Sequence, residues 1–144
     1  YVRVSLTFAL SVATIVWNIA HLSGGHINPA VTITLLLTRR ISLIRGAFYL
    51  VAQCVGAICG AGILNLVSPD PLAFRSLGTS SPGTGVTTIQ ALVIEMLITF
   101  VLLWTVYATI DQSRTDHQGS GPLAIGLAIG MCHLWAVCGK LIYF

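Results

Sequence analysis

Charged residues are scarce in this chain: they make up 8% of its 144 residues, whereas about a quarter of a soluble domain is charged. Hydrophobic residues account for 56% of the sequence. The seven basic residues outnumber the four acidic ones, but they are scattered along the chain (Arg3, Arg39, Arg40, Arg45, Arg75, Arg114 and Lys140). This composition excludes a soluble domain and a nucleic-acid-binding surface, and it predicts a membrane protein.

The four cysteines are too few for a secreted disulfide scaffold, and they lie inside apolar stretches without CxxC spacing (Cys54, Cys59, Cys132 and Cys138). We therefore expect reduced, packed cysteines and no disulfide framework. No set of His, Cys and carboxylate residues has the spacing of a metal site, and no nucleophile is paired with a base. The sequence thus predicts neither an enzyme nor a bound cofactor. The chain opens at Tyr1 without a signal-peptide pattern, and we expect a preceding segment to be missing.

Four apolar windows are each long enough to cross a bilayer, which takes about 20 residues. They predict membrane spans at about residues 2–21, 46–66, 88–110 and 121–141, with no separate soluble domain within residues 1–144. The first window would run roughly 50 Å as one helix, whereas the hydrocarbon core is about 30 Å thick. The residues that break helices, Gly24, Gly25 and Pro29, lie together in the middle of this window. We therefore expect an irregular loop and a short half-helix over residues 22–38, the half-helix starting at Pro29.

The arginines predict the orientation of the chain. Three of them lie within residues 39–45, whereas the connection at 65–87 carries only Arg75. Cytoplasmic loops are enriched in basic residues, so residues 39–45 and the joint at 111–120 are expected in the cytoplasm. This topology is consistent only if the segment 24–38 enters the membrane and leaves on the same side.

The chemistry of the predicted loop follows from its depth in the membrane. Irregular backbone cannot face lipid, so a loop at that depth must line a wet path or be covered by protein. Asn28 is a strong helix N-cap and Pro29 fits the first helical position, which directs the positive end of the helix dipole towards mid-membrane. The carbonyls of Gly24, Gly25 and His26 can act as acceptors and the Asn28 amide as a donor. For Asn-Pro alone, an ordinary cytosolic turn is the alternative interpretation.

The stretch SGGHINPAVT resembles the signature of the aquaporin, or major intrinsic protein, family. Further matching pieces are AQCVGAICGAGIL in the second complete span, Glu95 in the third span, which we expect to be buried, and GPLAIGL opening the fourth. The resemblance extends to about Ala136. It implies an all-α membrane protein, a right-handed helical bundle with six spans and two re-entrant half-helices, of which this chain matches spans two to five. It also implies a homotetramer in which each protomer holds its own pore.

The resemblance implies the following pore-lining residues: Gly24, Gly25, His26, Asn28, Pro29 and Ala30. It places Phe8 and His133 at the narrowest point of the pore, and this pair resembles the water-selective branch of the family rather than the glycerol-conducting one. Taken singly, Phe8 could be an ordinary core- or lipid-facing aromatic and His133 an ordinary packed histidine. For Glu95 the resemblance suggests a hydrogen-bonded carboxyl that supports the irregular loop.

Beyond Ala136 the sequence departs from the family pattern, and a second Asn-Pro followed by Arg is missing, so we expect an incomplete form of the channel. The predicted function is passive water permeation by a multi-pass protein of the plasma membrane. The expected partners are water, the lipid bilayer, and further copies in a homotetramer or a mixed assembly with full-length relatives. Three alternatives remain: a non-conducting truncated subunit, a glycerol channel, and a proton transporter that uses intramembrane histidines and Glu95.

Overall fold

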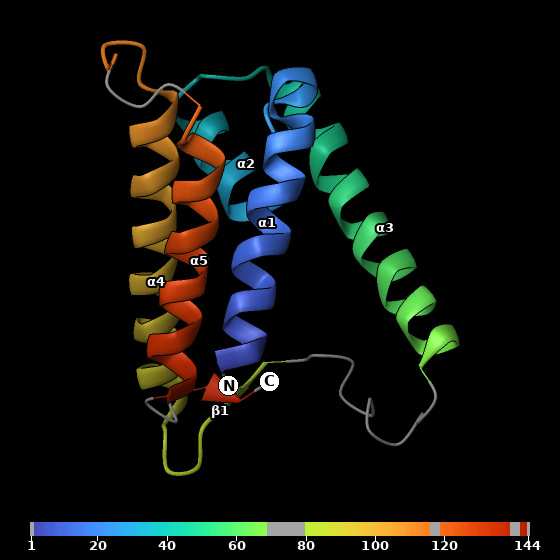
Figure 1. Cartoon of the computed structure of the whole chain (residues 1–144), viewed down its shortest axis with the longest axis vertical. Helices are drawn as coiled ribbons and strands as arrows, with labels where there is room; N and C mark the ends of the chain where they lie inside the picture. Colours follow the sequence, from blue (N-terminus) through green and yellow to red (C-terminus); the bar gives the residue numbers. More distant parts are fainter. Residues whose placement is uncertain (1, 69–79, 116–118, 139–141, 144) are drawn as a thin grey trace. The chain divides into compact units, whose positions relative to one another are not determined.

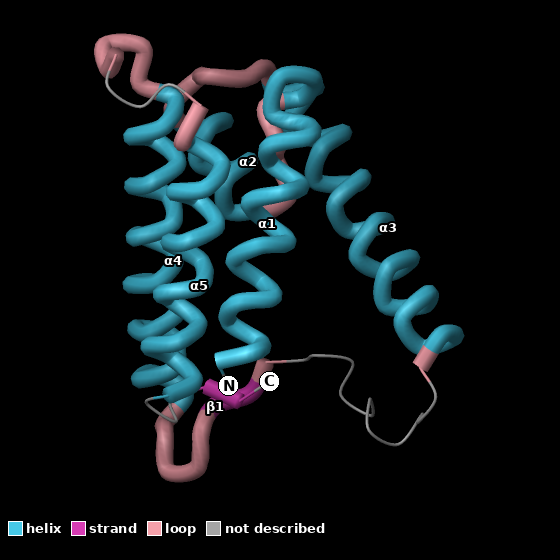
Figure 2. The backbone as a smooth tube through the Cα atoms, in the orientation of Figure 1, coloured by secondary structure: helices cyan, strands magenta, loops and turns pink. Residues whose placement is uncertain are grey.

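The computed structural model describes residues 2–68, 80–115, 119–138 and 142–143, and helices dominate this part of the chain (Figure 2). The helices are α1 (Val2–Ser23), α2 (Pro29–Leu37), α3 (Leu43–Val67), α4 (Thr88–Ile110) and α5 (Gly121–Cys138). Two short strands, β1 (Ser81–Pro82) and β2 (Ile142–Tyr143), pair with each other. The chain forms two compact units. We call residues 1–26 with 82–143 the α1–α4–α5 unit and residues 27–81 the α2–α3 unit.

Three of the described helices, α1, α3 and α4, are long and apolar enough to cross a membrane. Each helix begins and ends within three residues of a span expected from the sequence. At the start of α3, three residues before the expected position, Ser42 caps the helix by accepting a hydrogen bond from the Arg45 backbone N–H at 3.3 Å. The helix therefore begins before the arginine. Residues 139–141, expected at the end of the last span, and Arg75, used for the orientation, lie outside the described residues.

In the α1–α4–α5 unit, α1 and α4 both pack against α5 (Figure 1). The contact between α1 and α5 is a seam of small residues. A methyl group on Gly126 would overlap the Ala9 carbonyl oxygen and lie 2.7 Å from the Ala13 Cβ, and one on Gly130 would lie 2.8 Å from the Ala9 Cβ. Lipid offers no hydrophobic drive for helix association, so close backbone approach through small residues supplies the packing energy. Glycine is thus required at both positions by the space available.

Two further buried residues, Ser5 and Cys132, lie in the contacts of this unit. Ser5 is 1% exposed on α1, and on α5 the thiol of Cys132 donates a long hydrogen bond of 3.6 Å to the Ile98 carbonyl of α4. Large apolar side chains cover the outside of the unit, among them all three tryptophans of the chain (Trp17, Trp104 and Trp135). An apolar exterior of this kind suits a hydrocarbon environment.

In the α2–α3 unit, the nine-residue helix α2 packs against α3. Gly46 of α3 is buried, and a methyl group there would lie within 2.7 Å of the Leu36 side chain. After α2 the chain reverses at Arg39, which has a positive φ of 57°. The Arg39 N–H donates to the Leu36 carbonyl at 3.0 Å and the Arg40 N–H to the Leu35 carbonyl at 2.8 Å. This is the Schellman pattern of helix ends, and it stops α2 at half the length of a span.

Two expectations about side-chain burial are wrong. Glu95 is exposed on α4, because this helix turns the face that carries Ile94, Leu102 and Val106 inward and Glu95 lies beside that face. Cys54 and Cys59 are exposed on α3, where Gly46 is the one residue classed as buried among the described positions of the helix. Cys132 is the exception, since it is buried as expected.

Candidate functional site

The N-terminus of α2 is built around Asn28. This residue has the extended conformation of an N-cap, with φ −137° and ψ 127°, and Pro29 takes the first helical position. The Asn28 side-chain oxygen accepts a hydrogen bond from the Ala30 N–H at 2.8 Å, and its backbone carbonyl accepts one from the Thr32 N–H at 3.1 Å. The cap expected from the sequence is thus formed through both oxygen atoms of one residue.

The capping bonds decide which donors the helix tip can offer. Pro29 has no N–H, and the N–H groups of Ala30 and Thr32 already bond to Asn28. The Asn28 side-chain oxygen is held by its bond, so the amide NH2 group points away from it. That NH2 group has no partner among the residues that the structure describes, and Asn28 is half-buried. A fixed amide donor therefore stands at the positive end of the α2 dipole.

The loop before Asn28 offers acceptors. Gly24 and Gly25 have φ angles of 85° and 68°, a backbone region that residues other than glycine rarely adopt. The Gly24 N–H donates to the Ala20 carbonyl at 2.8 Å and so ends α1. Within the described ranges, neither the Gly24 nor the Gly25 carbonyl accepts a hydrogen bond from a backbone N–H outside the helices. The His26 ring lies close over Gly24: its Cδ2 and Nε2 atoms are 3.2 Å from where a Cβ at that glycine would stand.

Phe8 of α1 and His133 of α5 lie in contact. Their ring centroids are 4.5 Å apart and the ring planes differ by 20°, so the rings are stacked. The His133 Nδ1 lies 3.0 Å from the Ile129 carbonyl oxygen. Because a carbonyl oxygen only accepts, Nδ1 carries a proton in this contact. Phe8 is 45% exposed and His133 is half-buried.

The stacked geometry defines what the pair can do. At this separation water does not fit between the rings, so the two side chains form one continuous wall with an apolar face and a polar imidazole edge. The structure thus brings together the two residues that the family resemblance paired, from positions 125 apart in the chain.

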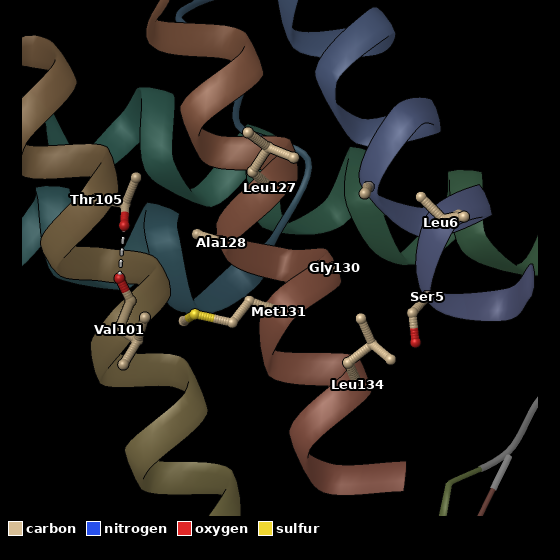
Figure 3. A pocket seen from close by; sticks show the side chains of 10 residues that line it. Ser5, Leu6, Val101, Thr105, Leu127, Ala128, Gly130, Met131 and Leu134 are labelled. Atoms are coloured by element: carbon tan, nitrogen blue, oxygen red, sulfur yellow. Dashed lines mark hydrogen bonds between the residues drawn. The ribbon is translucent and has the colours of Figure 1, made fainter. Parts of the chain in front are cut away.

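A groove of about 570 Å³ lies on the α1–α4–α5 unit (Figure 3). Its lining is apolar except for two hydroxyl groups, and the Thr105 hydroxyl donates to the Val101 carbonyl at 3.0 Å. The lining residues are Ser5, Leu6, Ala9, Val101, Thr105, Leu127, Ala128, Gly130, Met131 and Leu134. Neither Phe8 nor His133 is among them.

The remaining candidates are Glu95 and possible metal ligands. The Glu95 carboxylate has no partner in the described part of the chain, so its expected support of a loop stays a prediction. No group of three or more His, Cys, Asp and Glu residues that could hold a metal ion occurs among the described residues. Sequence reasoning missed Thr32 and Gln53, which link α2 to α3. In the sequence, the glutamine inside an apolar window and the threonine one turn after the cap could have indicated this link.

The chain is similar in sequence to known proteins over most of its length. The family model described as major intrinsic protein matches residues 1–139. Aquaporin-4 of Mus musculus and aquaporin-4 of Homo sapiens are each 48% identical over 136 residues, which cover 94% of this chain and 42% of theirs. Aquaporin-1 of Canis lupus familiaris is 47% identical over 136 residues, 94% of this chain and 50% of its own. The chain therefore spans no more than half the length of these relatives.

Proposed function

The chain belongs to the major intrinsic protein family, and we propose that it forms part of a pore for passive water permeation across the lipid bilayer. It is a multi-pass membrane protein of the all-α class. One observation carries the proposal: the capping bonds of Asn28 hold its amide so that the NH2 group is left as a donor at the start of the half-helix.

Water needs both kinds of partner to pass through a narrow path without large loss of hydrogen bonding. The Asn28 NH2 group donates to a water oxygen, and the carbonyls of Gly24 and Gly25 accept from water hydrogens. The positive end of the α2 dipole disfavours cations at Asn28. Selectivity in aquaporin-type pores is generally attributed to pore diameter, lining donors and acceptors, and such electrostatic barriers.

The aromatic wall of Phe8 and His133 supports water over glycerol as the permeant. Two stacked rings occupy space that a small side chain would leave open, and the imidazole edge gives the passing molecule few hydrogen-bonding partners. A glycerol molecule would need more width and more partners than this wall provides. Glycerol conduction is therefore the second candidate function, and it is the less favoured one.

The proposal extends to assembly and location. We assign the chain to a homotetramer, or to a mixed assembly with longer members of its family, in the plasma membrane. Family membership supports this assignment. The exposed apolar side chains of the described helices suit contact with lipid or with further helices.

The test uses a chimera, because the chain spans 42% of aquaporin-4 of Mus musculus. The aligned residues of this chain replace the matching segment of that protein, and the purified chimera is reconstituted into vesicles. We expect stopped-flow swelling to give a water permeability well above that of empty vesicles, with glycerol flux at the empty-vesicle level. A chimera that inserts like its parent protein but passes no water would overturn the proposal.

Two parallel measurements separate the alternatives. The 144-residue chain, reconstituted alone and then together with its full-length relative, distinguishes a conducting chain from a non-conducting associate. A pH-gradient assay on the same vesicles reports proton transport. Proton flux in the chimera that exceeds that of the parent protein would favour the transporter interpretation over the water pore.

A further inference from the structure

A polar link joins the half-helix to the span that follows it. Thr32 of α2 is 0% exposed, and its hydroxyl oxygen accepts a hydrogen bond of 2.9 Å from the Gln53 amide nitrogen of α3. Both residues belong to the α2–α3 unit. They lie 21 positions apart in the chain, so the bond is a tertiary contact.

The link continues to the capping residue. The Thr32 hydroxyl lies 3.4 Å from the Asn28 carbonyl oxygen and donates to it, beside the backbone bond of 3.1 Å to the same oxygen. A hydroxyl has one hydrogen to donate and lone pairs to accept, so both contacts can form together. The direction is then consistent throughout: the Gln53 amide donates to Thr32, and Thr32 donates to Asn28. Hydrogen bonds in such a series strengthen one another.

A short helix needs this kind of support. Isolated helices of fewer than about 12 residues are marginal, and α2 has nine residues. Its cap holds the Asn28 side chain relative to α2, but the cap alone does not fix the half-helix relative to a membrane span. Gln53 supplies a directional contact between the two helices, one turn from the cap.

We propose that Gln53 is a positioning residue for the amide donor of Asn28 and that it acts through the Thr32 hydroxyl. The role in permeation rests on the proposed water pore, whereas the positioning itself does not. Loss of the link lets the cap of α2 move, so that the donor is no longer held at one orientation.

The first experiment measures positioning in the 144-residue chain itself, reconstituted in lipid nanodiscs. Gln53→Met keeps the length of the side chain and removes the donor, and Thr32→Val keeps the branched shape and removes the hydroxyl. We expect hydrogen-exchange protection of the Ala30 and Thr32 amides to fall about three- to tenfold in each variant, the effect of one interhelical hydrogen bond in a membrane. The double variant should lose no more than the larger single loss, because the two changes break one link.

Matched controls keep the result specific. Thr32→Ser retains the hydroxyl and should retain the protection. Thr34→Val removes a hydroxyl from the same helix, one that donates to the Ala30 carbonyl at 2.8 Å, and should leave the coupling between Gln53 and Thr32 intact. Additive losses in the double variant, or protection unchanged by Gln53→Met, would overturn the proposal. If Thr32→Val failed to insert, Gln53→Met with Thr32→Ser would still decide it.

The second experiment carries Gln53→Met into the water-conducting chimera. We expect the ratio of cation leak to water permeability to rise about three- to tenfold at equal protein insertion, with Thr32→Ser near the parent value. An unchanged ratio in the presence of reduced amide protection would overturn the link to permeation. A chimera that conducts no water in any variant defeats the proposed function instead and leaves the exchange result to decide on positioning.

Discussion

Asn28 has two roles that different substitutions can separate. Its oxygen atoms cap α2, and its NH2 group is a donor at the helix tip. Aspartate can replace the cap because it also accepts from a backbone N–H, but it adds a negative charge at the positive end of the helix dipole. Serine retains a capping oxygen and has no NH2 group.

We predict that Asn28→Asp in the conducting chimera increases cation leak about two- to fivefold, the factor that corresponds to about 0.3–1 kcal/mol of charge–dipole interaction. Conductance of planar bilayers with the purified protein measures the leak. Asn28→Ser is the control: it should lower water permeability without increasing the leak. Equal leak in Asn28→Asp and the parent chimera would show that Asn28 is only a turn residue.

The aromatic wall leads to a prediction about selectivity. Removing both rings with Phe8→Ala and His133→Gly should widen the path, so that glycerol permeability rises about tenfold or more while water flow continues. Light scattering of vesicles in glycerol gradients gives the rate. Phe100→Ala is a matched control, because Phe100 is an exposed aromatic of α4 outside the wall. Unchanged solute discrimination in the double variant would contradict the assignment.

Arg39 carries the one positive φ angle among the described non-glycine residues. A left-handed conformation costs an L residue about 1–2 kcal/mol, and glycine is spared this cost. Arg39→Gly should therefore raise the stability of the α2–α3 unit by about 1 kcal/mol, measured by denaturant unfolding followed by circular dichroism. Arg40→Gly, at a neighbouring position with ordinary φ, should give no such gain. A gain of equal size at both positions would point to the loss of charge as the cause.

At the scale of elements, the seam between α1 and α5 leaves no space for another methyl group at Gly126 or Gly130. We predict that Gly126→Ala destabilises the α1–α4–α5 unit by about 1–3 kcal/mol, the usual penalty for overpacking. Unfolding in mild detergent with added denaturant measures the change. Gly56→Ala on α3 is the matched control, since a Cβ there meets nothing within 4 Å, and it should be neutral or slightly stabilising.

The helices themselves were accessible from the sequence because their signals are local. A run of apolar residues and the Asn28–Pro29 start each act within one or two turns of the chain. The seam between α1 and α5 was not accessible in the same way. Gly126 and Ala9 read as ordinary apolar-span residues until the fold brings them together.

In the candidate site, too, the features set by local sequence were predictable and those set by contacts between helices were not. The Asn28 cap follows from residue type and spacing alone, whereas the contact of Phe8 with His133 was expected through the family resemblance and not through any local pattern. The link from Gln53 to Thr32 joins two helices and was missed. Burial of Glu95 was expected through the family resemblance, but which face of α4 turns inward depends on the packing partner.

At the scale of the whole molecule, the re-entrance of residues 22–38 is a prediction about topology. If it holds, Ser23 and residues 39–45 lie on the same side of the membrane. The measurement is labelling of single introduced cysteines with an impermeant maleimide, after the native cysteines have been replaced, because Cys54 and Cys59 are exposed on α3. Labelling of Ser23→Cys and Arg40→Cys from opposite sides would exclude a re-entrant segment.

The tryptophans have a consequence for how the molecule can be observed. Trp17, Trp104 and Trp135 all lie in the α1–α4–α5 unit, and residues 27–81 contain no tryptophan. Indole fluorescence therefore responds to one unit, whereas far-ultraviolet circular dichroism records the helices of both. Where the two optical signals change at different denaturant concentrations, the difference measures how independently the half-helix and its neighbouring span melt. The native sequence thus contains a spectroscopic label for one of its two parts without any added dye.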